Sequence, residues 1–265
     1  MPVAPAGKAN AVMRRRILTI WLRVALLVLF LGGWQLSSGT LIDPYFFSRP
    51  SDVMVRLWQI IVSGELARNF IATIYEGAMG YLIGGVAAIA SGFILGRVKL
   101  AGNVLDPFIT GFFSIPKLAL APLIILWFGI GDPSKIVLAG LLTFYQVFWN
   151  TYAGVQKVEH ELIDVVRVMG ASHWQLLREV IFPSSVGWIL VGLRMAVPYA
   201  LMGAVVGEIM AGNRGLGYMV QAAASQFDTT GVFAVLIVLA AIGSTVSAAM
   251  SYVDRRSQRW NASGQ

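Results

Sequence analysis

Long apolar runs separated by short polar segments extend along most of the chain. Several of these runs approach the length of about 20 residues that an α-helix needs to cross a bilayer. The pattern predicts about six membrane-spanning helices joined by short loops. The predicted spans are roughly Ile17 to Leu36, Phe70 to Leu95, Pro107 to Phe128, Lys135 to Val155, Ser184 to Ala211 and Gly231 to Val253.

The composition agrees with a helical membrane protein. The 265 residues are 57% hydrophobic and 12% charged, and the mean hydropathy is +0.72. A soluble domain carries about 25% charged residues, so we predict an all-α polytopic membrane protein. Basic residues beside spans explain the net charge of +7 and give no reason to expect nucleic-acid binding. The chain contains no cysteine, so we expect neither a disulfide framework nor a thiolate metal site.

Basic residues beside the first and last spans predict the orientation of the chain. Three arginines at positions 14–16 precede the first span, and arginines at 255–256 follow the last. Because cytoplasmic segments are enriched in Lys and Arg, we expect both termini in the cytoplasm and therefore an even number of spans. The first apolar run is interpreted as a span and not as a cleaved signal peptide. The predicted parts are an N-terminal tail (1–16), a transmembrane domain (17–253) and a C-terminal tail (254–265).

Small residues recur at every fourth position in the predicted second span. They are Gly80, Gly84, Ala88, Gly92 and Gly96. Residues at this spacing share one helix face, so another helix can approach closely. Glu76 lies near the outer end of the same span. An acid in a span is a candidate for function, but its position favours a solvated or helix-start role.

Two predicted spans contain residues that are unusual at membrane depth. Prolines free backbone carbonyls, which are tolerated there only where protein or water satisfies them. A lysine facing lipid is unfavourable, so Lys117 should face a cavity, a partner or a span end. A simple proline kink with a snorkelling lysine remains the alternative. The candidate residues for a translocation pathway are Pro116, Lys117, Pro122, Arg194, Pro198 and Glu208.

The longest polar interruption in the second half of the chain is Glu161 to Pro183. Its first part has apolar residues at helical spacing, and Gly170 then predicts a sharp left-handed turn. Ser172 and Gln175 have the spacing of a capping box that starts a second helix, and we expect Pro183 to end that helix. This pattern predicts a docking element outside the membrane, although an interfacial loop helix has the same pattern.

Motifs for catalysis and nucleotide binding are missing. The sequence has no G-x-x-x-x-G-K-[ST] loop for phosphate, no H-E-x-x-H and no G-x-S-x-G. Two histidines in one loop are too few for a catalytic zinc site. We therefore expect no enzyme activity, no metal site and no cofactor in this chain.

The segment Asp164 to Pro183 resembles the signature loop of permease subunits of bacterial binding-protein-dependent ABC importers. That signature reads Glu-Ala-Ala, three residues, Gly, nine residues, an aliphatic residue, one residue and Leu-Pro. The spacing is retained here, with Asp for Glu, valines for both alanines and Phe for Leu. The matching residues are Asp164, Val165, Val166, Gly170, Val180, Phe182 and Pro183.

Two further segments resemble the nitrate, sulfonate and taurine branch of these permeases. One is Pro116 to Gly131, which includes Leu-Trp-Phe-Gly-Ile-Gly, and the other is Gly215-Leu216-Gly217-Tyr218 after Glu208. The resemblance covers roughly Ser48 to Arg256. It implies a type I ABC importer permease in a bacterial inner membrane.

The resemblance also implies how the chain works with partners. The loop 157–183 would hold the coupling helix, which sits in a cleft of an ATPase subunit that binds ATP and Mg. Two permease copies would pair with two ATPases inside and one periplasmic or lipid-anchored binding protein outside, all in contact with membrane lipids. The implied coupling residues are Glu161, Asp164, Val165, Val166, Gly170, Ala171 and Pro183.

The solute is less defined than the class of transporter. Lys117 and Arg194 favour a small anion such as a sulfonate, taurine or nitrate, whereas related permeases also carry vitamin precursors. An ion- or proton-coupled secondary transporter, or a scaffold or channel without turnover, remains the alternative. Two glutamates in predicted spans, both toward the outer side, give weak support to proton coupling.

Overall fold

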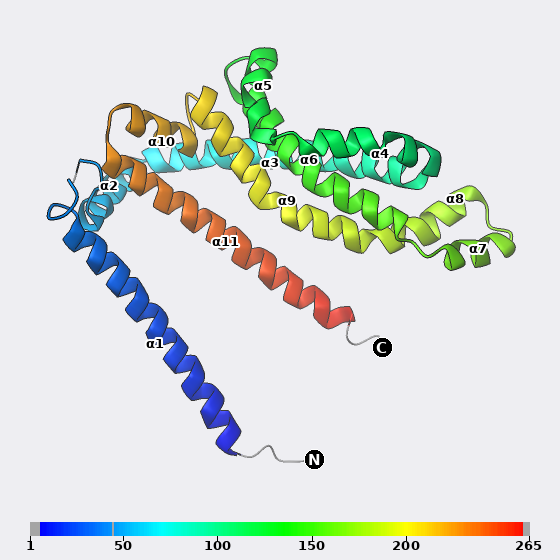
Figure 1. Ribbon diagram of the computed structural model, residues 1–265, viewed down its shortest axis with the longest axis horizontal. Helices are drawn as coiled ribbons and strands as arrows, with labels where there is room; N and C mark the ends of the chain where they lie inside the picture. The colour runs from blue at the N-terminus through cyan, green and yellow to red at the C-terminus, as the bar shows by residue number, and fades with distance from the viewer. Residues whose placement is uncertain (1–5, 44, 262–265) are drawn as a thin grey trace.

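The computed structural model describes residues 6–43 and 45–261, and within them the chain folds almost entirely into helices (Figure 1). The helices are α1 (Ala6–Ser37), α2 (Pro50–Val62), α3 (Glu65–Arg97), α4 (Lys99–Ser114), η1 (Lys117–Leu120), α5 (Ala121–Phe128), α6 (Asp132–Gln156), α7 (His160–Val168), α8 (His173–Gln175), η2 (Leu176–Ile181), α9 (Phe182–Ala211), α10 (Leu216–Ser225) and α11 (Thr229–Asn261).

The centre of the molecule is α6, which packs between α3 and α9 (Figure 1). Small residues bring the three helices together. A Cβ added at Gly80 of α3 would lie 2.5 Å from Ala139 Cβ, and one added at Gly203 of α9 would lie 2.6 Å from Ala139 Cα. The predicted small-residue stripe of the second span is thus confirmed as the face that contacts α6. Side chains larger than hydrogen cannot fit at these contacts without separating the helices.

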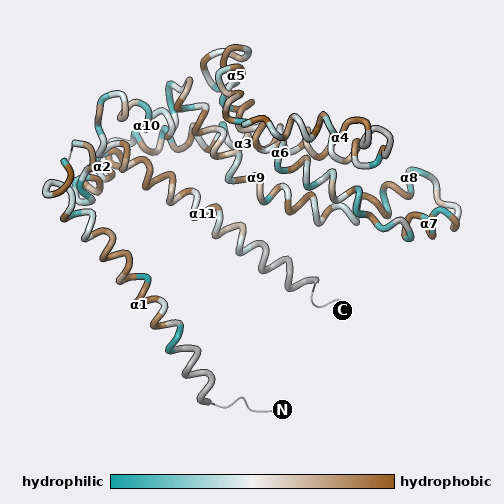
Figure 2. Tube along the Cα trace, in the orientation of Figure 1, coloured by the Kyte–Doolittle hydropathy of each residue, from teal (hydrophilic) through white to brown (hydrophobic). Residues whose placement is uncertain are grey.

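The long helices α1 and α11 contact the centre much less. Both run away from the bundle in Figure 1, and α1 is apolar along much of its length in Figure 2. None of the most apolar stretch of α1 is buried inside the chain. In α11, 11% of the corresponding stretch is buried. A single copy of the chain therefore leaves these helices exposed to lipid or to neighbouring chains.

The number of predicted spans is not confirmed. Within residues 6–43 and 45–261, four helical segments are long and apolar enough to cross a bilayer, or up to five if the bent pair Pro107–Ser114 and Lys117–Phe128 forms one span. The helix α6 is not among them, although its 25 residues extend about 37 Å at 1.5 Å per residue. Polar residues such as Gln146 and Asn150 lower its hydropathy, and α6 is largely covered by other helices.

The third predicted span is sharply bent. Its two halves differ in direction by 82° at a break before Lys117. Ile115 has an extended backbone (φ −68°, ψ 130°), as expected for a residue that precedes a proline. The predicted kink is therefore confirmed, and Pro116 is its local cause.

Several predicted loops and tails are helical instead. The segment between the second and third predicted spans lies mostly in α4, and the segment between the fifth and sixth contains α10. Residues 6–16 of the predicted N-terminal tail begin α1, and 254–261 of the C-terminal tail end α11; the remainder of both tails lies outside the described residues. Good helix formers such as Lys, Leu and Ala start α4, whereas α10 depends on contacts with distant helices.

Candidate functional site

The polar segment forms a helix, a glycine turn and a second capped helix. Gly170 has φ +87°, and the N–H groups of Gly170 and Ala171 donate to Arg167 O at 3.0 Å and to Val166 O at 3.3 Å. These two bonds form a Schellman motif, which satisfies the carbonyls at the end of α7. A Cβ at Gly170 would meet no atom within 4 Å, so the backbone conformation alone explains the glycine.

The predicted capping box at the start of α8 is confirmed. Gln175 N donates to Ser172 Oγ at 3.3 Å, and Ser172 N donates to Gln175 Oε1 at 2.8 Å. Two backbone donors at the helix start are thereby satisfied. The turn between α7 and α8 is therefore fixed at one end by backbone hydrogen bonds and at the other by two side chains that accept from backbone N–H groups.

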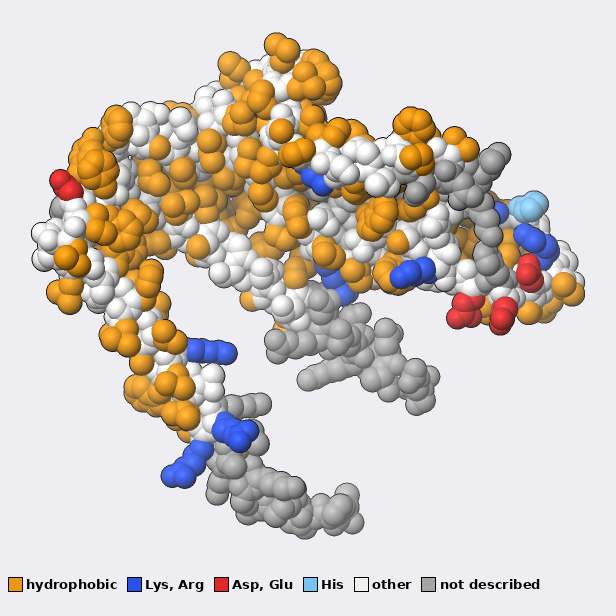
Figure 3. All heavy atoms as spheres, in the orientation of Figure 1, with side chains coloured by type: hydrophobic (Ala, Val, Ile, Leu, Met, Phe, Trp, Pro, Cys, Tyr) orange, Lys and Arg blue, Asp and Glu red, His pale blue; other side chains and the backbone are white. Residues whose placement is uncertain are grey.

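The tip of this turn presents apolar side chains to the outside. Val168 is 88% exposed, Met169 80% and Trp174 68%. We call Val168, Met169 and Trp174 the apolar tip. It lies at the opposite end of the molecule from α2 and α10 (Figure 1), and charged side chains surround it (Figure 3). The turn thus holds exposed apolar side chains at one end of the molecule.

The inner side of α7 anchors the turn to the bundle. Val166 and Ile163 pack against a buried cluster that includes Val155, Leu176 and Ile181. Asp164 and Arg167, by contrast, are exposed and lie 3.6 Å apart, and Glu161 and Val165 are also exposed. The predicted coupling residues thus divide into an anchoring face and an outward face.

The prediction that Pro183 ends the second helix was wrong. Helix α8 continues through the π-helical segment η2 directly into α9, which begins at Phe182. Pro183 lies in the first turn of α9, directly after the π-helical segment. The wider π turn precedes the proline, so the chain passes it without a break. The apolar tip is consequently joined to α9 by one continuous helical path.

A cavity of about 630 Å3 opens beside the bend of the third predicted span. We call it the aromatic cavity, because rings from α4, α6 and α9 line much of its wall. Pro116 and Lys117 reach it from the bend, and Gln146 supplies a polar group. The ring-bearing residues of the lining are Phe113, Tyr145, Trp149 and Tyr199.

Lys117 is held in this cavity by carbonyl and ring contacts. Its Nζ donates to Phe113 O at 3.1 Å and lies 4.6 Å from the centre of the Tyr145 ring. The Tyr145 hydroxyl in turn donates to Phe112 O at 2.9 Å. Both interpretations of the third predicted span therefore have support, because the proline kink and a lysine that faces a cavity occur together.

The remaining pathway candidates lie elsewhere. Pro122 and Pro198 are exposed, Arg194 is half-buried in α9, and Glu208 is buried near the start of α10. None of these lines the aromatic cavity. The sequence analysis did not name two residues that line the cavity, Tyr145 and Trp149. They are four positions apart and so share a helix face. This spacing beside the polar Gln146 could have indicated a cavity wall.

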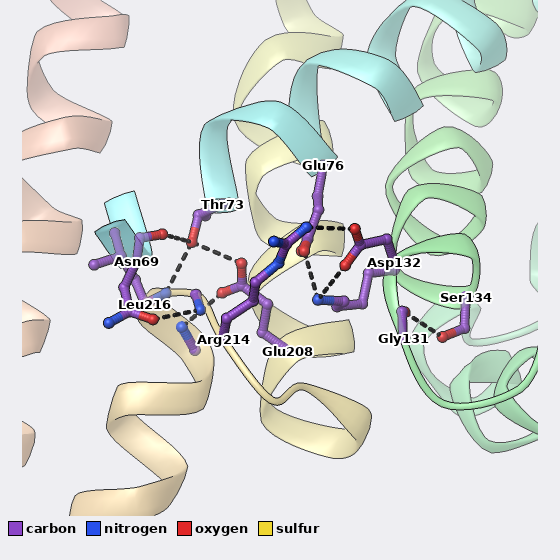
Figure 4. A network of polar contacts seen from close by, with 12 residues as sticks. Asn69, Thr73, Glu76, Gly131, Asp132, Ser134, Glu208, Arg214 and Leu216 are labelled. Carbon is purple, nitrogen blue, oxygen red and sulfur yellow. Dashed lines mark hydrogen bonds and ion pairs between the residues drawn. The ribbon is translucent and has the colours of Figure 1, made fainter. Parts of the chain in front are cut away.

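A second polar cluster joins α3, α6, α9 and the loop before α10 (Figure 4). Lys135 Nζ lies 2.5 Å from Glu76 Oε1 and 3.2 Å from Asp132 Oδ1. Asp132 also pairs with Arg214 at 2.5 Å. The expectation that Glu76 is solvated was wrong, since its side chain is fully buried. The basic partner comes from α6, a contact that local sequence could not show.

Glu208 holds the start of α10. Its carboxylate accepts from Gly217 N at 2.7 Å and from Thr73 Oγ1 at 2.6 Å, and Thr73 Oγ1 accepts from Leu216 N at 2.8 Å (Figure 4). A carboxylate at a helix N-terminus is favourable because N–H groups and the helix dipole face it. Gly215 has φ +109°, and a Cβ there would collide with the Glu208 carboxylate. This arrangement explains the Gly215-Leu216-Gly217 sequence.

Asp132 lies at the start of α6, outside the predicted span. Burial raises the pKa of the Asp132 carboxyl. The hydrogen bonds and charges of Lys135 and Arg214 lower this pKa by more than burial raises it, so it lies below its ordinary value of 3.8. Asp132 is therefore ionised at neutral pH and connects α6 to the loop that carries Arg214.

The amino-acid sequence matches a known protein family. Residues 67–259 match the family described as "Binding-protein-dependent transport system inner membrane component". The chain belongs to this family. The match covers the turn between α7 and α8, the aromatic cavity and the ion pairs around Lys135, and this chain is an ABC importer permease, a transport subunit and not an enzyme.

Similar proteins include two curated permeases. A putative aliphatic sulfonates transport permease of Bacillus subtilis is 32% identical over 92% of this chain and 89% of its own length. The riboflavin transport system permease of Chloroflexus aurantiacus is 36% identical over 89% of each chain. The permease chain also shares its fold with a solved amino acid ABC transporter with histidines, at a TM-score of 0.59, 20% identity and coverage of 81% of this chain and 99% of that one.

Proposed function

We propose that this permease moves a small solute inward through a bacterial inner membrane, using ATP that separate ABC ATPase subunits bind with Mg and hydrolyse. A periplasmic or lipid-anchored binding protein delivers the solute, and two permease copies form the pathway. Both termini lie in the cytoplasm in this arrangement. The observation that carries the proposal is the apolar tip, exposed on a rigid turn at one end of the bundle.

The apolar tip has the properties of a docking element for an ATPase subunit. A flexible loop would absorb the motion of a partner, but the Schellman motif and the capping box hold this turn in one shape. Val168 and Met169 would insert into an apolar cleft, while Glu161 and Asp164 remain available to polar groups at its rim. The sequence has no phosphate-binding loop of its own, which agrees with a separate motor.

Motion at the tip can reach the membrane helices. The path from α8 through η2 into α9 has no break, and α9 packs closely against α6. A displacement of the tip by the ATPase therefore moves α9 against its neighbours as a rigid body. Alternating access by rocking of packed helices is a known route for such transport.

The proposed solute is a small organic anion such as a sulfonate or taurine. Lys117 in the aromatic cavity favours a negative charge, and one relative is named for aliphatic sulfonates. The aromatic wall of the same cavity also favours a second candidate, a flat heteroaromatic vitamin or its precursor, and another relative is named for riboflavin.

Co-expression with an ABC ATPase subunit of a sulfonate importer tests the docking. The tagged wild-type chain should retain the ATPase on an affinity column, and Met169→Asp should lose it, because an acid cannot enter an apolar cleft without a large desolvation penalty. Leu41→Asp is the matched control, since Leu41 is 85% exposed but lies between α1 and α2. Retention of the ATPase by Met169→Asp, or uptake that an uncoupler abolishes without any ATPase present, would overturn the proposal.

A further inference from the structure

The two lysines Lys117 and Lys135 differ in what surrounds their ammonium groups. Lys135 is fully buried and ion-paired with Glu76 and Asp132. Lys117 is only half-buried, and no carboxylate of the described residues lies within ion-pair distance of its Nζ. One carbonyl and two ring faces are its contacts. An ammonium group has three donors, so Lys117 keeps donors available toward the cavity.

A cation in this position favours an anionic ligand. Charge-assisted hydrogen bonds are stronger than neutral ones, particularly away from bulk water. The carboxylates that could have neutralised a lysine in the spans are already engaged, Glu76 with Lys135 and Glu208 with the start of α10. The counter-charge for Lys117 must therefore come from the solute or from solvent ions.

The rings beside Lys117 are arranged as a fixed wall. Phe113 contacts Tyr145 edge-on at 4.5 Å and Trp149 at 5.5 Å between ring centres. The hydrogen bond from Tyr145 to Phe112 O fixes the Tyr145 ring. Trp149 is 46% exposed, so one of its faces is free to stack on a ligand. Aromatic stacking adds to the area that a flat ring buries.

We propose that the aromatic cavity is a solute-binding site for an organic anion with a flat, unsaturated body. Lys117 binds the sulfonate or carboxylate group, and Trp149 with Tyr145 holds the ring. The volume of about 630 Å3 lies within the range of about 300–1,000 Å3 that is common for small-ligand sites. This inference rests on the proposed function, because it names the substrate class of the same transporter.

Equilibrium dialysis on the purified full-length chain in lipid nanodiscs tests the site without any partner. The probes are radiolabelled benzenesulfonate, propanesulfonate without a ring, and benzamide without a charge. Benzenesulfonate should bind more tightly than both, and Lys117→Met should weaken its binding about tenfold or more, as expected for loss of a charge-assisted hydrogen bond. Lys117→Met should leave benzamide binding unchanged, and Trp149→Leu should weaken benzenesulfonate and benzamide alike.

Two further variants separate a specific effect from a loss of structure. Lys117→Arg retains the charge and should retain most of the binding. Lys157→Met is the matched control, because Lys157 also lies over a ring, 4.2 Å from Trp188, but outside the cavity. Absence of wild-type binding up to about 10 mM, where the binding free energy falls below about 3 kcal/mol, would refute the site. Equal weakening by Lys117→Met and Lys157→Met, or a preference for propanesulfonate, would do so too.

Uptake into proteoliposomes that hold the whole importer distinguishes this inference from the proposed function. If uptake of benzenesulfonate requires ATP but is unchanged in Lys117→Met, the importer stands and the site is wrong. If binding depends on Lys117 but the assembled importer shows no ATP-dependent uptake, the site stands and the proposed function is wrong.

Discussion

Lys135 Nζ on α6 lies 2.5 Å from Glu76 Oε1 on α3, and both side chains are fully buried. This ion pair joins two helices of the central bundle near the start of α6. Glu76 Oε2 has no hydrogen-bond partner, so the lysine is the main compensation for a buried carboxylate. The pair therefore fixes how α3 and α6 meet.

Removing one partner of this pair should destabilise the protein strongly. Lys135→Met leaves Glu76 buried beside Asp132 without its nearest cation, and breaking a buried pair in this way costs about 3–5 kcal/mol. The double variant Lys135→Met with Glu76→Leu should recover much of that loss, because neither member of the ion pair is then left buried without the other. Chemical unfolding of each variant in the same detergent measures the effect, and equal stability of single and double variants would contradict the assignment.

Packing at Gly203 should be intolerant of any larger side chain. A Cβ there lies 2.6 Å from Ala139 Cα, so Gly203→Val must separate α9 from α6, with a loss of about 1–3 kcal/mol for overpacking. Gly187 in the same helix has nothing within 4 Å of its Cβ position, and Gly187→Val should change stability little. The unfolding temperatures of the two variants provide the measurement. Similar decreases in both would show that helix propensity, and not the contact with α6, determines the loss of stability.

The stabilising effect of the ion pairs of Asp132 should be insensitive to pH across the neutral range. Its folded pKa is lowered below 3.8, so its stabilising contribution is fully present above the unfolded pKa and is lost only as the pH falls through the lower folded pKa. Asp132→Asn should therefore unfold at a lower temperature than the wild type at every pH from 5 to 8. That difference should shrink below about pH 4. A difference that already fades between pH 7 and pH 5 would assign the effect to another group.

Local patterns in the sequence were sufficient to predict the shape of the turn between α7 and α8. Gly170 and the Ser172–Gln175 spacing are signals that act within a few residues, so their backbone consequences follow from the residue types alone. The small-residue stripe of α3 was equally local. Pro183 was misjudged because the π-helical turn before it changes which residues pair along the helix.

Contacts between distant segments could not be predicted in the same way. Glu76 was expected to be solvated, because its partner Lys135 lies 59 positions away in sequence. No local sequence pattern predicts this contact. The helix α10 was expected to be a loop. Its first N–H groups donate to Thr73 and Glu208 of other helices, and contacts of this kind are not visible in the local sequence. The wall of the aromatic cavity likewise forms only when α4, α6 and α9 come together.

ATP-dependent uptake by Gly170 variants tests the central claim most directly, namely that a separate ATPase drives this permease through the turn between α7 and α8. Gly170→Asn tolerates the left-handed backbone, whereas Gly170→Val does not. In proteoliposomes that contain permease, ATPase and binding protein, uptake should require ATP, persist in Gly170→Asn and be lost in Gly170→Val, with all variants inserted equally. Normal uptake by Gly170→Val, or solute movement by the purified permease alone, would contradict the claim.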